Sequence, residues 1–364
     1  MAAADPVTYL VADAVTGIVL DALPLVGTVA ETRAQVETAT WNLPLTDDHT
    51  PTDWWGLTMP WKVMIVAVWH GHPIQAWVIV SRRFGQAECE LGGATIERFL
   101  ECVYARDADW LSVDSALVSA QLVNQVLVPQ GGWVVEYVET GTRIDHFTQL
   151  DAAATVYDQL EELEGGEGGP KWRKLLRWVP GEERRTLQKV IRIGPEVGDP
   201  KPAVVFELPP SGYTRIEQWD DESAALRVWA TTEGSGAGMT PTPFESPLLD
   251  EGWHPKELVA SFTDLDDPEL ERRKHQRGRD LANGTIAWEA TFEIDRAPLL
   301  VDEWNVSDTV TFHAAPNAYD PAGGELTAVV DGWELDPQAN TVTPRLIQEA
   351  DQRALEADQG GDGG

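Results

Sequence analysis

The first ninety or so residues are a series of short β-prone runs separated by turn residues. In the run 32–45, the residues alternate in part, with Ala34, Val36, Thr38 and Thr40 on one side and Arg33, Gln35 and Glu37 on the other. A ribbon with one polar face belongs to a sheet with one face in water, which favours antiparallel strands. The chain therefore has to begin with an all-β barrel or sandwich. Its expected strands are 7–13, 18–25, 32–45, 62–69, 74–83 and 86–93.

The pattern changes after Gly93, where apolar residues recur every three or four positions, as in helices. The expected helices are 94–105, 114–128 and 150–165, with Asp114 and Asp151 near the first turns of the last two. From residue 186 the β-prone runs return, interrupted by an expected helix at 267–283 and ended by a hairpin at 324–347. The sequence therefore predicts a mainly β fold with α insertions (α+β). The expected domains are a first β-barrel domain (1–93), a helical or mixed insert (94–185), a second β-rich domain (186–347) and an acidic, disordered tail (348–364).

Charge and composition exclude several classes of function. A net charge of −33 argues against a nucleic-acid-binding surface, since phosphate contacts need clustered Lys and Arg, and it disfavours anionic membrane surfaces. The two cysteines, Cys89 and Cys102, are too few for a disulfide framework or a zinc site. The longest strongly apolar run, Val63–Trp69, is far shorter than a membrane span, so no membrane-spanning segment is expected. The acidity itself has three explanations: general solubility, a halophilic host, or a surface that DNA passes without binding.

No motif in the sequence predicts catalytic, cofactor-binding or metal-binding residues. His70-Gly71-His72 has no third ligand nearby and is typical of a hairpin turn. Gly234–Gly238 is glycine-rich, but no Lys-Ser or Lys-Thr follows it as in a phosphate loop. The clustered carboxylates are expected to be a solvated helix face; they are Glu161, Glu162, Glu164 and Glu167.

Aromatic and basic clusters are also expected to be structural. Trp54, Trp55 and Trp61 lie close together in the sequence, and buried packing is favoured over a sugar-binding platform. The basic cluster 271–279 is expected to make salt bridges within the chain or to a neighbouring subunit.

Taken in order, nine segments resemble the tail-hub family of long-tailed bacteriophages, called minor tail proteins in phages of actinobacteria. They begin with TGIVLDALPL and end with VVDGWELDP. Their positions are 16–25, 41–45, 72–84, 89–101, 190–198, 227–239, 246–253, 306–314 and 329–337. The chain departs from the family at Gln35–Thr38, where a turn glycine is usual. Since it ends soon after the closing hairpin, it is similar to the N-terminal hub part of tail-associated lysins, with no further domain expected.

The resemblance implies two tube-like β-barrel domains with a helical insert, and a homotrimer. Three copies of two similar barrels give a pseudo-sixfold ring that docks on a sixfold tail. The implied role is structural, not enzymatic: a hub at the virion tail tip, synthesised in the host cytoplasm, with no cofactor. Implied partners are the distal tail ring, the tape measure protein and other minor tail or receptor-binding proteins. Genomic DNA is implied only as transient cargo during ejection, which an acidic lumen would not retain.

Three alternatives remain open. A hexameric distal tail ring protein also starts with a barrel, but the helical middle and the second β region count against it. A cell-wall glycosidase needs two carboxylates across a cleft, which the sequence does not show. A halophilic carbohydrate-binding module predicts loss of folding at low salt.

Overall fold

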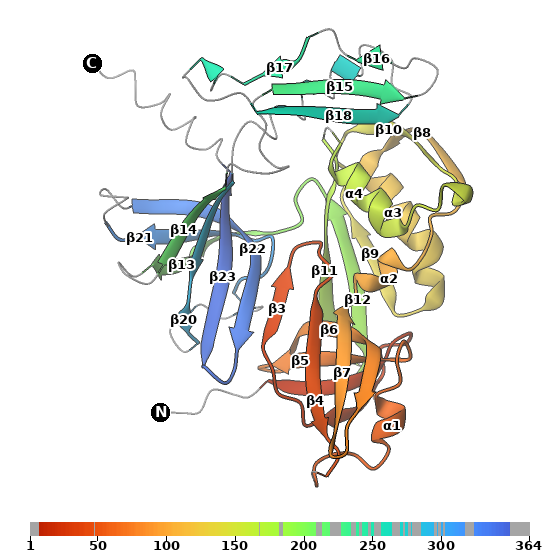
Figure 1. Ribbon diagram of the computed structural model, residues 1–364, viewed down its shortest axis with the longest axis vertical. Helices are drawn as coiled ribbons and strands as arrows, with labels where there is room; N and C mark the ends of the chain where they lie inside the picture. The colour runs from red at the N-terminus through yellow and green to blue at the C-terminus, as the bar shows by residue number, and fades with distance from the viewer. Residues whose placement is uncertain are drawn as a thin grey trace. The chain divides into compact units, whose positions relative to one another are not determined.

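The structure is a computed structural model, and its fold is mainly β with few helices, as the sequence predicts (Figure 1). Contacts divide the chain into two units: unit 1 comprises Met1–Pro210 and Ala290–Pro344, and unit 2 comprises Ser211–Glu289 and Arg345–Gly364. The residues that the structure describes are 7–46, 48–166, 168–181, 185–208, 213–218, 227–233, 238–239, 242–246, 249–250, 256–263, 270–271, 274–275, 278, 285–294, 297, 300, 303–316 and 324–349.

Unit 1 opens with a six-stranded antiparallel sheet in the order β2-β1-β5-β6-β7-β4 (Figure 1). All seven side chains of β5 are buried, because its sequence is apolar throughout and the strand lies inside the sheet. The predicted β5–β6 hairpin is confirmed, and its turn residues His70 and Gly71 have φ of 46° and 84°. The strands are β1 (Thr8–Asp13), β2 (Val19–Leu23), β4 (Thr38–Pro44), β5 (Val63–Trp69), β6 (His72–Phe84) and β7 (Glu88–Thr95).

The expected single strand 32–45 is wrong, because the chain turns at Ala34, whose φ is 51°. Strand β3 (Val29–Thr32) precedes this turn and pairs with β22 (Gly324–Asp336), whereas β4 follows it and pairs with β7. The expected apolar side is also wrong: in β4 the buried residues are Trp41 and Leu43, while the even-numbered Thr38 and Thr40 are exposed. The segment therefore forms two separate strands, which belong to two different sheets.

The helices lie mainly in the middle of the chain, and they agree only in part with those predicted from the sequence. Helix α3 (Ser115–Val126) confirms the prediction, and the Asp114 carboxylate accepts a hydrogen bond from Ala116 N at its start. The expected helix 94–105 is wrong, because β7 continues to Thr95 and only a single turn of helix follows. The expected helix 150–165 starts later: Thr155, not Asp151, caps α4 (Val156–Glu164) with a capping box. The remaining short helices are α1 (Trp54–Leu57), α2 (Arg98–Glu101), η1 (Val128–Gln130) and η2 (Leu150–Ala152).

Two small sheets accompany these helices, and the whole region shares one hydrophobic core with the first sheet. Strand β10 (Arg143–Thr148) pairs with β8 (Ala108–Asp114). A second sheet has the order β11-β12-β9, from Lys171–Trp178, Leu187–Gly194 and Trp133–Tyr137. Met64 of β5, Leu122 of α3 and Ile191 of β12 belong to the same buried cluster. Since contacts leave 1–93 and 94–185 together in unit 1, the expected division at residues 93 and 185 stays a prediction.

The second large sheet of unit 1 joins distant parts of the chain. Its order is β13-β21-β22-β23, with β3 beside β22 and β20 beside β23. Strands β22 and β23 are neighbours connected by residues 337–340, which confirms the closing hairpin. The strands not yet bounded are β13 (Pro200–Leu208), β20 (Phe292–Glu293), β21 (Thr309–Ala314) and β23 (Thr341–Glu349).

Unit 2 contains the end of β23, which pairs with β19 (Thr285–Ala290), and β14 (Tyr213–Gln218) beside β19. It also has a separate sheet in which β15 (Arg227–Glu233) pairs with three strands: β16 (Gly238–Met239), β17 (Phe244–Glu245) and β18 (Glu257–Thr263). Most of the expected helix 267–283 and nearly all of the tail 348–364 lie outside the described residues.

Candidate functional site

Strand β11 carries two adjacent basic residues on opposite faces, and both are buried. Successive side chains of a strand point to opposite faces, so Arg173 and Lys174 contact different parts of unit 1. The exposed fractions of their side chains are 6% and 3%. A buried charge requires a partner, because removal from water costs several kcal/mol per ion. The partners of these two residues therefore show what β11 holds together.

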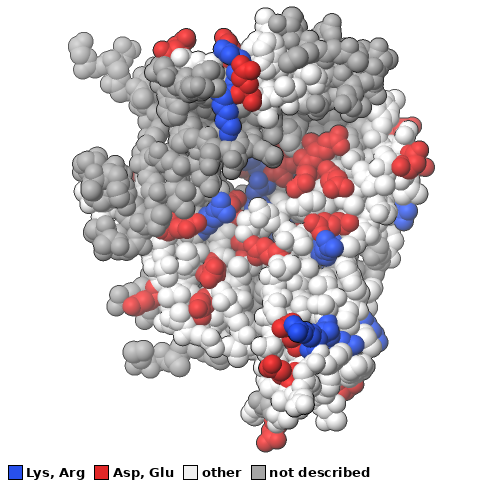
Figure 2. All heavy atoms as spheres, in the orientation of Figure 1, with Lys and Arg blue, Asp and Glu red and all other residues white. Residues whose placement is uncertain are grey.

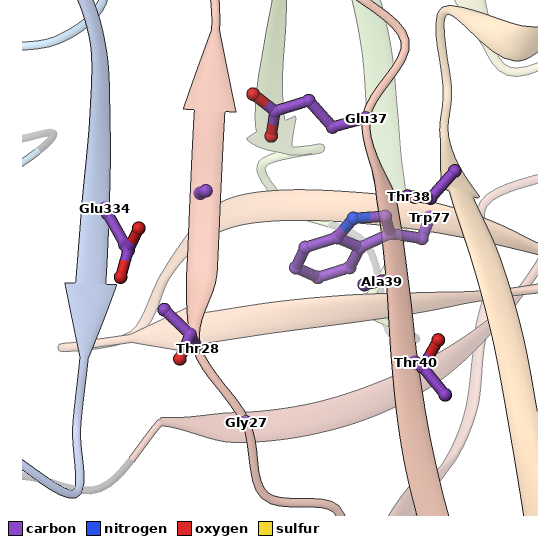
Figure 3. A pocket seen from close by; sticks show the side chains of 9 residues that line it. Gly27, Thr28, Glu37, Thr38, Ala39, Thr40, Trp77 and Glu334 are labelled. Atoms are coloured by element: carbon purple, nitrogen blue, oxygen red, sulfur yellow. The ribbon is translucent and has the colours of Figure 1, made fainter.

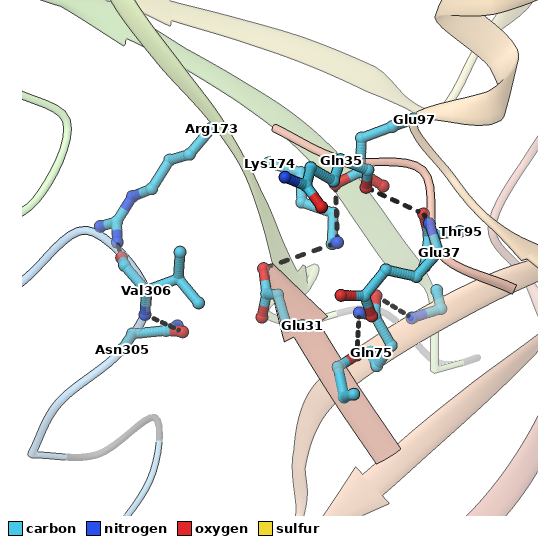
Figure 4. Close-up of polar contacts among 12 residues, drawn as sticks. Glu31, Gln35, Glu37, Gln75, Thr95, Glu97, Arg173, Lys174, Asn305 and Val306 are labelled. Atoms are coloured by element: carbon cyan, nitrogen blue, oxygen red, sulfur yellow. Dashed lines mark hydrogen bonds and ion pairs between the residues drawn. The ribbon is translucent and has the colours of Figure 1, made fainter. Parts of the chain in front are cut away.

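Lys174 forms a buried cluster with carboxylates from two other segments (Figure 4). Its Nζ lies 2.6 Å from Glu97 Oε1, just after β7, and 3.6 Å from Glu31 Oε1 on β3. Side chains of all three residues are at most 10% exposed. Glu31 also belongs to the strand that pairs with β22, so this cluster links the insert, the first sheet and the second large sheet.

The cluster is short of positive charge, and the pKa values reflect this. Burial raises the pKa of Glu31 to about 7; Lys174 and Arg173 oppose the rise, whereas Glu97 and Glu37 add to it. Burial alone would lower the pKa of Lys174, but the carboxylates of Glu97 and Glu31 outweigh burial and raise it. Lys174 is therefore held charged, while Glu31 changes its ionisation near neutral pH.

Replacing Glu31 by glutamine is expected to remove a pH dependence from stability. The pKa of Glu31 is about 7 in the folded chain and near its ordinary value of 4.5 in the unfolded chain. At a pH between these two pKa values, unfolding therefore releases a proton from Glu31. The free energy of unfolding therefore falls as pH rises through this window, by on the order of 3 kcal/mol. Urea unfolding at pH 5 and pH 8 should show the Glu31→Gln variant gaining stability relative to the original chain at the higher pH. Parallel changes in both proteins would contradict this, and Glu196→Gln, at an exposed site, is the control.

Arg173 makes the corresponding link on the other face of β11. Its guanidinium donates to the carbonyl oxygen of Val306 and lies 3.6 Å from Asp308 Oδ1. The Asp308 carboxylate also accepts a hydrogen bond from Asp199 N, 2.8 Å away. Strand β11 is thus bound to the segments that lead into β13 and β21.

A third buried base, Lys189 of β12, binds the turn after β1. Its Nζ donates to the carbonyl oxygens of Ala14 and Val15 at 2.6 and 3.2 Å, and lies 5.1 Å from the centre of the Trp133 ring. Burial lowers the pKa of Lys189 to about 8, against the attraction of Asp13. This lysine stabilises the close approach of the chain's first turn to a strand more than 170 residues away.

Unit 1 also contains a cavity of about 430 Å³ beside strands β3 and β4 (Figure 3). Carboxylates of Glu37 and Glu334 lie at its margin, and Trp77 forms part of its wall. The lining residues are Gly27, Thr28, Ala30, Glu37, Thr38, Ala39, Thr40, Trp77 and Glu334.

The motifs weighed in the sequence do not gather at this cavity. His70-Gly71-His72 forms the β5–β6 turn, and the Gly71 carbonyl accepts hydrogen bonds from Trp178 Nε1 and Arg185 Nη2. In the described part of the chain, no three His, Cys, Asp or Glu side chains are placed to hold a metal ion. Of Gly234–Gly238, only Gly238 is described, and of 271–279 only residues 271, 274, 275 and 278 are.

The clustered carboxylates of α4 have partners within the fold. Glu164 pairs with Arg33, and Glu162 accepts a hydrogen bond from Gln159 Nε2 at 3.0 Å. Glu167 lies outside the described residues.

The expected burial of the three tryptophans is wrong for Trp55 and Trp61, and Trp54 is only half-buried. Trp55 and Trp61 are 50% and 44% exposed, since α1 and the loop after it lie at the surface. Trp55 stacks on Phe84 with ring centres 5.2 Å apart, and the Arg82 guanidinium lies 4.5 Å from the Trp55 ring centre. The Trp55 ring is therefore packed against Phe84 and Arg82 of the protein itself.

Charge on the described surface is mostly acidic. Figure 2 shows acidic side chains spread over the visible face, with basic side chains beside them and no broad basic area among the coloured residues. No helix of the described chain is both long enough and apolar enough to span a bilayer.

Comparison with solved structures gives several matches over whole chains. The tail protein from Neisseria meningitidis matches with a TM-score of 0.57 and 13% identity, covering 94% of this chain and 97% of that one. A 43 kDa prophage tail protein from Shewanella oneidensis matches at 0.56 and 11%, covering 94% and 99%. A prophage tail protein from Listeria monocytogenes matches at 0.53 and 9%, covering 94% and 95%.

The chain has the fold of these phage tail proteins. No protein-family model and no curated protein sequence matches it. The fold is therefore shared at sequence identities of 9–13%, where side chains differ and topology remains.

Proposed function

We propose that the chain is a structural protein of a bacteriophage tail tip, where it forms a homotrimeric hub ring. The observation that carries this proposal is the fold, shared over 94% of this chain with three tail proteins, two of them of prophage origin. A likeness that covers whole chains on both sides supports a subunit of the same kind of assembly. It argues against a common module inside an unrelated protein.

The two large sheets of unit 1 are the proposed tube-like elements of the ring. In a trimer, each protomer would contribute two such elements, giving six around the axis of a sixfold tail. Their closure into barrels is part of the proposal. The buried links through Arg173 and Lys174 support two such elements in one protomer, because they fix segments of both sheets to a common strand.

The proposed partners are the distal tail ring, the tape measure protein and other minor tail or receptor-binding proteins. Genomic DNA would pass through the ring at ejection. The chain has 60 acidic and 27 basic residues. This excess of negative charge supports the proposal that the ring's lumen repels DNA and does not bind it. Placement at the tail tip of a phage of actinobacteria, after synthesis in the host cytoplasm, is the remaining part of the proposal.

Native mass spectrometry of the purified 40.0 kDa chain over concentration and salt series tests the ring. The expected species is a trimer, at three times the mass of the chain. A hexamer would favour the distal tail ring alternative instead. A chain that stays monomeric at every concentration, with purified tail tubes added, would contradict the hub ring. Neither the glycosidase nor the carbohydrate-binding alternative has an observation in its favour among the described residues.

A further inference from the structure

Strands β3 and β4 each have one hydrogen-bonded neighbour among the described residues. Strand β3 pairs with β22, and β4, at the end of the first sheet, pairs with β7. Both strands contribute to the lining of the 430 Å³ cavity. An unpaired strand edge presents a row of backbone donors and acceptors that can pair with another chain.

The register shows which groups of β4 are on its free edge. Thr95 N donates to Glu37 O, and Leu45 N donates to Ala87 O, so odd-numbered residues of this segment face β7. The pairing of β4 with β7 has no register shift. In an antiparallel ladder, the backbone N–H and C=O groups of the intervening even-numbered residues point away from the partner strand. The backbone N–H and C=O groups of Thr38 and Thr40 therefore face away from β7, and both residues line the cavity.

The same reasoning places Ala30 on the free edge of β3. Arg33 N donates to Asp331 O, so odd-numbered residues face β22. The Ala30 carbonyl accepts a hydrogen bond from the buried Gln75 side chain at 2.8 Å, on the other side of β3. Ala30 lines the cavity as well. The cavity is therefore lined by residues on the free edge of β4. It is also lined by Ala30, which lies on the edge of β3 that faces away from β22.

The cavity also carries negative charge. Glu37, half-buried, and Glu334, exposed, both line it, and neither forms an ion pair with a described residue (Figure 3). The nearby Lys174 is engaged with Glu31 and Glu97. An occupant with a positive side chain would be favoured here, because it would offset two carboxylates of the same sign.

We propose that this cavity is a slot for an extended, lysine- or arginine-bearing segment of a partner protein, which adds to the edge of β4 and sets its cation against Glu37 and Glu334. Strand addition of this kind takes affinity from main-chain hydrogen bonds and specificity from side-chain pockets. The inference concerns one protomer and goes beyond the proposed ring, whose oligomeric state does not enter it.

The probe is a peptide of sequence Thr-Val-Lys-Val-Thr-Val-Lys-Val with fluorescein at its N-terminus and an amide at its C-terminus, added to the full chain. Its matched control has glutamate in place of both lysines. Fluorescence anisotropy is expected to show at least tenfold weaker binding of the glutamate peptide. Hydrogen exchange should show the Thr38 and Thr40 amides slowed at least tenfold by the lysine peptide. Equal binding of the two peptides, or unchanged exchange at both amides, would overturn the proposal.

Three variants, one of them a control, separate the slot from unspecific attraction to an acidic protein. The double variant Glu37→Gln/Glu334→Gln is expected to weaken binding of the lysine peptide at least tenfold, whereas Glu325→Gln, elsewhere on β22, should leave it unchanged. Thr40→Pro removes an edge donor that does not serve the β7 ladder, so it should reduce binding while the thermal unfolding midpoint is kept. Protection of Thr38 and Thr40 that grows with protein concentration and needs no peptide would instead identify a second copy as the occupant and overturn the partner assignment.

Discussion

Replacing Lys174 by methionine is expected to lower the free energy of unfolding by about 3–5 kcal/mol at pH 8. The change leaves Glu97 and Glu31 buried near each other without the cation that lies 2.6 and 3.6 Å from them. An uncompensated buried charge is among the most costly defects in a folded protein. Urea unfolding followed by tryptophan fluorescence measures the loss.

The control for Lys174 lies on the same strand. Lys171 pairs with Glu196 at 3.4 Å, with side chains 41% and 77% exposed, so Lys171→Met is expected to cost at most about 0.5 kcal/mol. At pH 5 the Lys174→Met loss should shrink, because the pKa of Glu31 is about 7 and this carboxyl is then neutral. Equal losses for the two lysine variants would show that the cluster does not stabilise the fold.

Replacing Gly17 by alanine is expected to cost about 2–4 kcal/mol, from a left-handed residue together with broken backbone hydrogen bonds. Gly17 has a φ of 76°, and a Cβ at this position would lie 2.0 Å from the carbonyl oxygen of Leu187. The Leu187 amide donates to Gly17 O at 2.8 Å, so the clash would force apart the two segments that this bond joins. The same urea titration reports the effect.

Substitution of Gly71 separates the two causes of the expected Gly17→Ala loss, which are the left-handed backbone and the clash with Leu187. Its φ is 84°, but a Cβ there would meet nothing within 4 Å. Gly71→Ala should therefore cost only about 1 kcal/mol, the strain of a left-handed alanine. If Gly17→Ala costs no more than Gly71→Ala, the close approach of the first turn to β12 is not required for stability.

The part of the fold that the sequence predicts well depends on neighbours in the chain. The β5–β6 hairpin follows from two apolar runs around a turn, and α3 follows from apolar spacing after a capping aspartate. The closing hairpin of β22 and β23 is of the same kind. In each case the residues that pair or cap are close in sequence, so local chemistry is sufficient.

The errors occur where a distant strand decides the outcome. Residues 29–32 pair with β22, about three hundred positions away, so the chain turns at Ala34 instead of continuing to β4. In the expected segment 94–105, Thr95 pairs with Trp77 in the sheet and Tyr104 forms a β-bridge with Thr155, and only one turn of helix, α2, lies between them. Trp55 and Trp61 are exposed because their short helix and loop lie at the surface, although tryptophan usually favours burial.

The sequence by itself determined the fold class, the early antiparallel sheet, the local hairpins and the acidity, since these follow from periodicity, turn chemistry and composition. Only the tertiary structure decided where charge is buried and which strand edges remain open. The cluster of Glu31, Glu97 and Lys174 and the cavity beside β3 and β4 each combine segments far apart in the chain. A charged residue in a β-prone run, such as Lys174 in KWRKLLRW, is a weak signal of such a site, because its partners are chosen by long-range pairing that local pattern does not encode.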